Sequence, residues 1–204
     1  STEQLEAFAE SYWPLVVLNR ELGCPGVGLI MVDNQRGMQL AVDHLVGRGH
    51  RAIALLAGPA TSPSSQQRVQ GYRRAMQGWD LPVVPGWVRP CPPTVEGGQS
   101  EAISLLSLHP EVTALIAYND LVALGACQAC EALGRPVPDR CAVVGFDDIR
   151  LAAMVKPRLS TIRVDKYELG RVAMQRLLTM LDQPEAVIAP QILDIELVIR
   201  ESAP

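Results

Sequence analysis

Short apolar runs alternate with amphipathic patterns along most of this chain. The segments 27–32, 52–57, 114–118 and 141–145 are rich in Val, Ile, Leu and Ala, which is typical of buried strands. After the first of them, Met38, Ala41, Val42, Leu45 and Val46 recur at helical spacing. Strands that alternate with helices in this way indicate βαβ units. The sequence therefore predicts an α/β fold, with a parallel sheet covered by helices on both faces.

Weaker patterns complete the predicted elements. Helices are expected at about residues 1–11, 66–77, 96–108, 120–133 and 166–181, and further strands at 14–18, 87–91 and 160–164. A single final strand is expected at 192–199. The Pro- and Ser-rich stretch 58–65 is expected to be a polar loop.

The chain is large enough to bury one or two cores. It has 204 residues, of which 48% are hydrophobic and 20% are charged, so its composition is that of a globular protein. Its formal net charge of −4 gives it no bulk attraction for nucleic acid or for an anionic membrane. We therefore expect any DNA binding to come from a segment outside these residues.

Cysteine usage favours a reducing compartment. Five cysteines are an odd number in a chain of this size, which needs no disulfide for stability, so the cytoplasm is the expected location. No apolar run approaches the roughly 18 residues of a membrane span. The first residues have neither the basic nor the apolar region of a signal peptide.

The sequence lacks the usual signatures of catalysis and of metal or cofactor binding. Cys127 and Cys130 have C-x-x-C spacing, but they fall inside a predicted helix without a second pair, so we expect neither redox chemistry nor a zinc site. The histidines are scattered, and there is no Gly-x-Ser-x-Gly nucleophile motif and no dinucleotide-binding glycine pattern. We therefore expect no enzyme activity, no cofactor and no metal.

Polar side chains follow three predicted strands, at the edge where parallel sheets bind ligands. Asn119 and Asp147 come directly after strands, and Arg68 lies on the helix after another. An amide, a carboxylate and a guanidinium at that edge could bind vicinal hydroxyls or an anion. Other interpretations stay open, because Asn119 could cap a helix, Asp147 could form a turn and Arg68 could be a solvated helical arginine. Ser64 could contact the same ligand or only form a turn.

A set of short motifs, in order along the chain, carries a resemblance to a known family. From about Leu15 to Pro204, the chain resembles the effector-binding core of the lactose-repressor (LacI) family of bacterial transcription regulators. The motifs are Val32-Asp33-Asn34 with Gly37 and His44-Leu45, Gly49-His50-Arg51-Ala52-Ile53-Ala54, Gly58-Pro59, Arg68-x-x-Gly71-Tyr72, Asn119-Asp120-x-x-Ala123-Leu124-Gly125, Val143-Val144-Gly145-Phe146-Asp147-Asp148, Leu159-Ser160-Thr161-Ile162, Glu168-Leu169-Gly170 and Leu197-Val198-Ile199-Arg200-Glu201-Ser202.

The resemblance implies a periplasmic-binding-protein-like type I fold, in which two doubly wound parallel-sheet subdomains are joined by three crossover strands. Residues 1–31 and 163–192 would form an incomplete amino-terminal subdomain, and residues 32–162 and 193–204 the carboxyl-terminal one. The family's DNA-binding headpiece would be absent, so operator DNA is expected to be contacted only through that missing amino-terminal part. An incomplete amino-terminal subdomain should expose a sheet edge and an apolar patch.

The resemblance also implies residue roles. Arg68, Asn119 and Asp147 match the family's polar effector contacts, Asn19 falls where the amino-terminal subdomain usually adds one, and Ser64 falls where a loop residue often does. The implied function is to bind a sugar or related small polar metabolite in the cleft between the subdomains and so to modulate operator binding. A periplasmic sugar-binding protein of a transporter is the alternative with the same fold.

Lys166 marks a departure from the sugar-responsive relatives. The positions near Pro93, Val164 and Lys166 often carry stacking aromatic or amide side chains in those relatives, and this chain has neither there. Lys166 would then either face an anionic effector or extend into solvent.

Two apolar segments predict self-association. The helix at 120–133 carries more apolar residues than one stripe facing a sheet needs, and residues 151–155 form an apolar run, although either segment could instead belong to the core. The family resemblance implies a two-fold homodimer through this part of the carboxyl-terminal subdomain.

Overall fold

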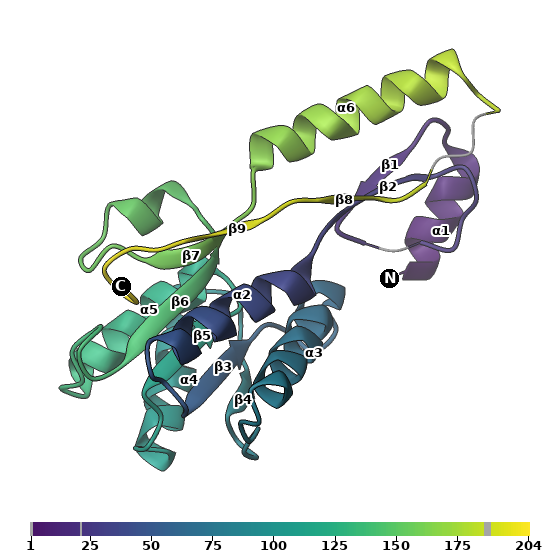
Figure 1. The fold of residues 1–204 in the computed structure, drawn as a ribbon. Helices are drawn as coiled ribbons and strands as arrows, with labels where there is room; N and C mark the ends of the chain where they lie inside the picture. Colours follow the sequence, from purple (N-terminus) through teal and green to yellow (C-terminus); the bar gives the residue numbers. More distant parts are fainter. Residues whose placement is uncertain (1, 21, 186–188) are drawn as a thin grey trace. The chain divides into compact units, whose positions relative to one another are not determined.

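The chain forms two compact units. The computed structural model describes residues 2–20, 22–185 and 189–204. Unit 1 consists of Ser1–Asp33 and Asp165–Asp194, and unit 2 consists of Asn34–Val164 and Ile195–Pro204. The chain therefore passes from one unit to the other after residues 33, 164 and 194 (Figure 1). This α/β organisation with parallel sheets confirms the predicted fold class.

Unit 1 is a small parallel sheet with one long helix packed on it. Its strands have the order β1-β2-β8, where β1 is Val16–Leu18, β2 is Gly28–Val32 and β8 is Gln191–Leu193. Helix α6 (Lys166–Asp182) packs against β1 and β2, and helix α1 (Thr2–Ser11) precedes the first strand. Within the described residues, β1 and β8 each pair with β2 alone, so both are edge strands of the sheet.

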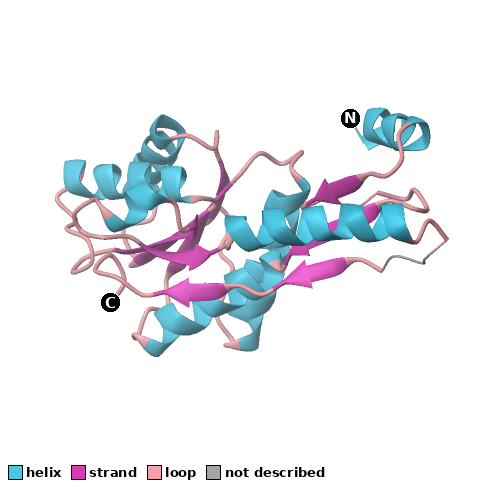
Figure 2. Ribbon diagram, turned by 90° about the horizontal axis from the view of Figure 1, so that it is seen from above, coloured by secondary structure: helices cyan, strands magenta, loops and turns pink. Residues whose placement is uncertain are grey.

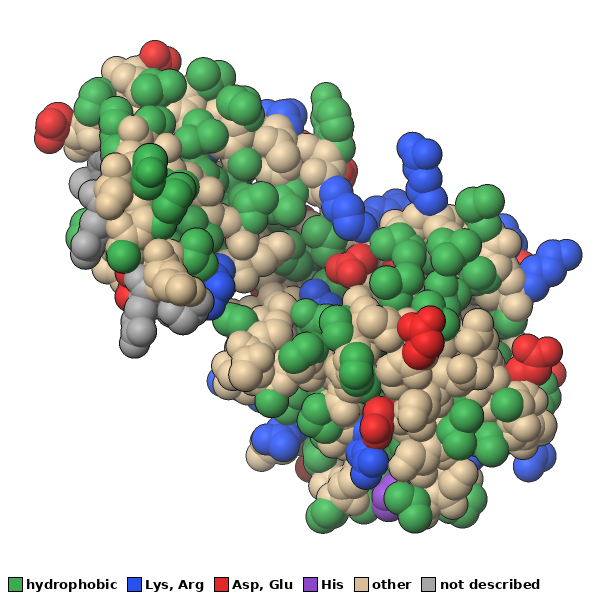
Figure 3. Space-filling model, turned by 180° about the vertical axis from the view of Figure 1, so that it is seen from behind, with side chains coloured by type: hydrophobic (Ala, Val, Ile, Leu, Met, Phe, Trp, Pro, Cys, Tyr) green, Lys and Arg blue, Asp and Glu red, His purple; other side chains and the backbone are tan. Residues whose placement is uncertain are grey.

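Unit 1 exposes many large hydrophobic side chains. Tyr167 on α6 is the most exposed of them, with 84% of its surface accessible. Figure 3 shows hydrophobic side chains of unit 1, at the upper left, on the molecular surface. These exposed side chains lie in the part of the chain for which an apolar patch is predicted. The exposed residues are Phe8, Tyr12, Trp13, Leu18, Tyr167, Met174, Leu178, Leu181 and Ile192.

Unit 2 contains a larger sheet with the strand order β4-β3-β5-β6-β7-β9. Figure 2 shows strands in magenta and helices in cyan. The chain leaves β3 for β4 on one side and then returns to β5 on the other, so the strand order reverses between β3 and β5. In open α/β sheets, ligands bind outside the carboxyl ends of the strands at such a switch point. The strands are β3 (Ile53–Ala57), β4 (Val88–Pro90), β5 (Ala114–Ala117), β6 (Ala142–Asp147), β7 (Ser160–Arg163) and β9 (Glu196–Val198).

Helices cover both faces of this sheet. Helix α2 (Asn34–Gly47) packs against α3 (Pro63–Gly78) on one face, and α4 (Val95–Leu108) packs against α5 (Asp120–Ala132) on the other (Figure 1). Every residue of β3 and β5 is buried, as expected for parallel strands with two covered faces. A Cβ on Gly125 would lie 2.0 Å from the carbonyl oxygen of Val95, so α4 and α5 approach more closely there than any other residue would allow.

The structure corrects three details of the sequence-based prediction. The expected final strand at 192–199 is two strands, β8 and β9, which pair in different sheets, and β9 runs antiparallel to β7. Helix α3 begins at Pro63, inside the expected loop, because the Ser62 hydroxyl caps it and Pro63 occupies its first turn. A short 3-10 helix, η1 (Arg150–Ala153), lies in the apolar segment where no helix was expected.

Candidate functional site

Three of the sequence-predicted site residues lie at the carboxyl ends of neighbouring strands in unit 2. Arg68 is in α3, which follows β3; Asn119 follows β5; and Asp147 is the last residue of β6. Since β3, β5 and β6 are adjacent and parallel, these residues share one edge of the sheet. This edge includes the switch point between β3 and β5.

The Arg68 side chain is buried rather than solvated, with 8% of the residue exposed. Its Nε donates a hydrogen bond to Asn34 Oδ1 (2.8 Å), and its Nη1 donates to the carbonyl oxygen of Tyr118. Its guanidinium carbon lies 3.5 Å from the centre of the Phe146 ring, an arrangement typical of a cation–π contact. Arg68 therefore links Tyr118, which precedes Asn119, to Phe146, which precedes Asp147.

Burial and a nearby carboxylate act on this arginine in opposite directions. Burial lowers the pKa of the Arg68 guanidinium, and the negative charge of Asp147 opposes that change. A buried cation is costly unless it is paired, so Asp147 and the aromatic rings of Tyr118 and Phe146 offset the cost of burying Arg68. The third guanidinium nitrogen, Nη2, makes no hydrogen bond with the part of the chain that the structure describes.

Asn119 is a helix cap, one of the two interpretations that the sequence left open. Its Oδ1 accepts a hydrogen bond from the backbone N–H of Val122 (2.9 Å), and so it caps the first turn of α5. That contact uses only the amide oxygen. Within the described residues the amide nitrogen, Nδ2, has no hydrogen-bond partner, so capping leaves a donor at the sheet edge.

Asp147 and Asp148 form a turn with an unusual backbone. Both have positive φ, at 109° and 47°, a region that residues other than glycine rarely occupy. The Asp148 carboxylate accepts hydrogen bonds from Arg163 Nε and Arg200 Nη2, each at 2.7 Å. Burial alone would raise the pKa of Asp148, but the two arginines outweigh it and hold that pKa below its ordinary value.

Asp120 is a structural residue of this edge that the sequence did not single out. Its carboxylate is fully buried and accepts hydrogen bonds from Thr161 Oγ1 (2.5 Å) and from the backbone N–H of Ile149 (2.7 Å). Burial raises the pKa of Asp120 to about 6, although both hydrogen bonds oppose the rise. A Cβ on Gly145 would lie 2.3 Å from Asp120 Oδ1, so the carboxylate occupies space that only a glycine leaves open.

Ser64 belongs to a cluster of three hydroxyl groups at the start of α3. Its Oγ lies 3.0 Å from Ser62 Oγ and 3.1 Å from Tyr118 Oη. Tyr118 was not among the predicted site residues, although it directly precedes Asn119 and its ring lies 4.8 Å from the Arg68 guanidinium carbon. The structure therefore brings Ser64, Arg68 and Tyr118 together beside Asn119.

Asn19 and Lys166 belong to unit 1, whereas Ser64, Arg68, Asn119 and Asp147 belong to unit 2. Asn19 has a positive φ of 55°, and its Oδ1 accepts a hydrogen bond from the backbone N–H of Val32 (3.0 Å), which ties the end of β1 to the end of β2. Lys166 is the exposed first residue of α6. Their roles as effector contacts stay predictions.

The chemistry of the unit 2 edge suits a hydroxylated ligand. Arg68 and Asn119 offer N–H donors, Asp147 offers carboxylate acceptors, and the hydroxyl cluster offers both. Among the described residues there is no group of three or more His, Cys, Asp or Glu side chains arranged to hold a metal ion. Cys127 and Cys130 lie inside α5, and burial raises the pKa of Cys127 to about 12, which disfavours the reactive thiolate.

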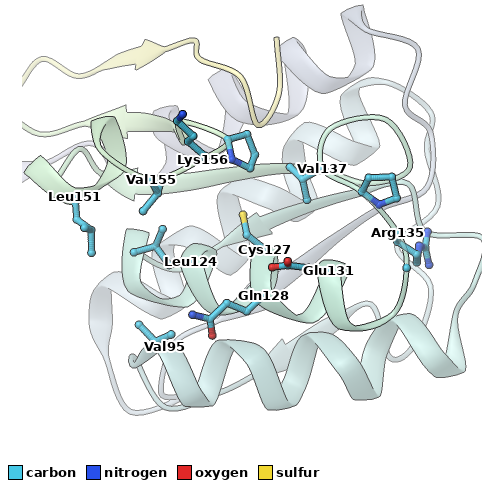
Figure 4. Close-up of a pocket in the computed structure, with 13 residues that line it drawn as sticks. Val95, Leu124, Cys127, Gln128, Glu131, Arg135, Val137, Leu151, Val155 and Lys156 are labelled. Carbon is cyan, nitrogen blue, oxygen red and sulfur yellow. The ribbon is translucent and has the colours of Figure 1, made fainter.

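A separate pocket of about 670 Å³ lies over α5 in unit 2 (Figure 4). Figure 4 shows Leu124, Cys127 and Glu131 on the helix, facing Leu151 and Val155 across the pocket. Most of the apolar residues of α5 are buried inside unit 2, so the surface available to a partner is narrower than the sequence suggested. The lining residues are Val95, Leu124, Cys127, Gln128, Glu131, Gly134, Arg135, Pro136, Val137, Leu151, Val155, Lys156 and Pro157.

None of the described helices combines the length and the apolar character that are needed to cross a bilayer.

Known proteins resemble the chain over most of its length. Residues 42–203 match the family described as the periplasmic binding protein-like domain. The chain is 33% identical over 189 residues to the probable HTH-type transcriptional repressor ExuR of Bacillus subtilis, and 34% identical over 192 residues to the HTH-type transcriptional repressor CytR of Escherichia coli. Each alignment covers 93% of this chain but only 57% and 55% of the respective relative, so the chain spans little more than half the length of these repressors.

Solved structures of transcription regulators also resemble the chain over most of its length. A regulatory protein of the LacI family from Chloroflexus aggregans matches 98% of this chain and 72% of its own, with a TM-score of 0.90 and 32% identity. The complex of the transcriptional regulator CelR with cellobiose matches 93% of this chain and 58% of its own, with a TM-score of 0.86 and 31% identity. A LacI family regulator from Enterococcus faecium with bound ribose matches 100% of this chain and 75% of its own, with a TM-score of 0.87 and 26% identity.

Proposed function

Because the chain belongs to the periplasmic binding protein-like domain family and, within it, to the LacI-type regulators, we propose that it is the effector-binding core of a bacterial transcription regulator. Its effector is a sugar or a related small polar metabolite, bound at the carboxyl edge of the unit 2 sheet. Arg68, Asn119 and Asp147 contact it, and Ser64 adds a hydroxyl. No bond is made or broken in this function.

The contacts of Arg68 are the observation that carries the proposal. The Arg68 guanidinium lies at the switch point, and its Nη2 makes no hydrogen bond with another described residue, so this nitrogen supports a role as a donor to a ligand. The Asn119 amide likewise keeps a donor after capping α5. N–H donors from Arg68 and Asn119, with the Asp147 carboxylate at the same edge of the sheet, suit the donor and acceptor character of vicinal hydroxyls.

Regulation follows from differential binding. An effector that binds one conformation of the regulator more tightly than another shifts the population toward the first. The free-energy difference, transmitted to a DNA-binding part of the protein, changes the affinity for operator DNA. The relatives are repressors and regulators, which favours this function over the alternative of a transporter's periplasmic sugar-binding protein. Location in the cytoplasm is part of the same proposal.

Self-association is the second part of the proposal. The pocket between α5 and residues 151–157 is open and mainly apolar, and Leu151 and Met154 beside it are exposed. We propose that a second copy of the chain covers this surface in a two-fold homodimer, because a two-fold axis lets one patch meet itself.

Calorimetric titration with ribose and with cellobiose tests the effector site. Arg68→Ala should weaken the binding of whichever sugar the wild-type chain binds by about 1.5 to 3 kcal/mol, the range for losing hydrogen bonds to a charged group. Arg73→Ala is the matched control, since Arg73 is an exposed arginine on the same helix. Equal affinity in wild type and Arg68→Ala would remove Arg68 from the site.

A further inference from the structure

The turn that ends β6 is held in a conformation that its own residues disfavour. Asp147 and Asp148 are consecutive non-glycine residues with φ of 109° and 47°. Such backbone persists only where surrounding contacts determine it, and it is frequent at ligand-binding sites. The contacts that hold this turn therefore decide where the Asp147 carboxylate points.

The main contacts of the turn converge on Asp148. Its carboxylate, with a side chain only 10% exposed, accepts hydrogen bonds from Arg163 and Arg200, both at 2.7 Å. Its backbone N–H makes a longer contact of 3.4 Å with Thr161 Oγ1. Two charge-assisted hydrogen bonds to one carboxylate fix its position more strongly than neutral contacts would.

Of the two arginines, Arg200 is the more firmly held. Its side chain is 13% exposed, its Nη1 donates to the carbonyl oxygen of Leu159 (2.8 Å), and its backbone N–H donates to Ser160 Oγ (2.8 Å). Arg163 is 44% exposed and divides its donors between Asp148 and Glu196. Exposed ion pairs contribute little to fixing a geometry, whereas a buried and hydrogen-bonded one resists displacement.

We propose that Arg200 is a positioning residue for the effector site: through Asp148 it holds the left-handed turn that aims Asp147 at the effector. Arg200 itself does not touch the effector. The inference rests on the proposed function for the role of Asp147, but the hold of Arg200 on the turn does not depend on it. Arg200 would thus set the geometry of Asp147, a binding residue more than fifty positions earlier in the sequence.

The first experiment needs no effector. Three-bond couplings between amide and Hα protons, measured by NMR in the 204-residue chain, report the φ angles of Asp147 and Asp148. Arg200→Ala should shift both couplings toward extended backbone, and Arg200→Lys, which keeps one donor and the charge, should restore part of the wild-type values. Arg158→Ala is the matched control. Arg158 precedes β7 and forms an exposed ion pair with Glu201, the residue that follows Arg200. Unchanged couplings in Arg200→Ala would overturn the proposal.

The second experiment measures affinity for ribose and cellobiose by calorimetry. Arg200→Ala should weaken binding about tenfold, as expected for disturbing hydrogen bonds to a charged group. In an Asp147→Ala background the same change should have no further effect, because Arg200 acts through Asp147. An equal loss in both backgrounds would contradict the positioning role. If neither sugar binds the wild type, the proposed function loses support, while the NMR couplings still decide whether Arg200 holds the turn.

Discussion

Asn119 shows how one side chain serves both interpretations that its sequence position allows. Its amide oxygen caps α5, and its amide nitrogen remains as a donor at the sheet edge within the described residues. The sequence could predict the position, because an asparagine directly after a buried strand and before a helix is a typical cap. It could not separate capping from ligand binding, since the two uses involve different atoms of one amide.

Asn119→Asp should separate these two uses. Aspartate is as good a helix cap as asparagine, so we expect the free energy of unfolding in urea to stay within about 0.5 kcal/mol of the wild-type value. The substitution removes the N–H donor and adds a second negative charge at the sheet edge that carries Asp147, so affinity for a neutral sugar should fall at least about tenfold. Asn119→Ala, which removes both atoms, should lose stability as well as affinity. Retained affinity in Asn119→Asp would leave Asn119 as a cap alone.

Asp120 gives the fold a measurable dependence on pH. Burial raises its pKa to about 6, so the folded protein binds a proton more tightly than the unfolded chain, in which an aspartate titrates near pH 4. The contribution of Asp120 to stability is therefore most favourable below about pH 4, and it is lost as the pH rises through about 6. In Asp120→Asn this titration is absent, and an amide can still accept from Ile149 and donate to the Thr161 hydroxyl.

We therefore expect the stability of wild type relative to Asp120→Asn to fall between about pH 4 and pH 7, by up to about 3 kcal/mol. Urea unfolding of both proteins across this range measures the difference, and other titrating groups largely cancel in it. A difference that stays constant with pH would show that Asp120 titrates normally in the folded protein.

At the scale of elements, the sequence predicts a strand well where the whole strand lies in one kind of surroundings. Strands β3, β5 and β6 are buried on both faces, so their apolar runs were visible in the sequence. The segment from β8 to β9 was not predicted, because its two short strands pair in different sheets and hydrophobic spacing carries no information on the partner. The apolar content of α5 allowed both a core helix and a partner surface, and most of it packs against α4, β5 and β6.

Self-association provides a test at this scale. Leu124 on α5 is 8% exposed and lines the pocket opposite Leu151 and Val155. Leu124→Glu would place a carboxylate in the surface that a second copy covers, so the variant should sediment as a monomer at concentrations where the wild type is a dimer. Leu108→Glu, a change of the same kind at an exposed residue of α4 outside the pocket, should leave the dimer intact. A wild-type chain that sediments as a monomer at every concentration would contradict the proposal.

For the whole molecule, the order of strands and helices was sufficient to predict the α/β class, and the strand ends were sufficient to locate the candidate site. Arg68, Asn119 and Asp147 were found because each follows a strand of one parallel sheet. Their supporting contacts were not predicted, since Asp148 and Arg200 are far apart in the sequence and meet only because β7 pairs with β9 beside β6. Contacts of that kind depend on tertiary pairing and leave no local pattern.

A titration of the isotope-labelled chain with ribose and with cellobiose, monitored by amide NMR shifts, tests directly whether the effector binds at this edge of the sheet. We expect that at least one sugar binds and that the largest shifts fall at residues 58–64, 118–120 and 146–149, around the carboxyl ends of β3, β5 and β6. No binding of either sugar, or shifts confined to the pocket between α5 and residues 151–157, would contradict the assignment of the effector site to this edge.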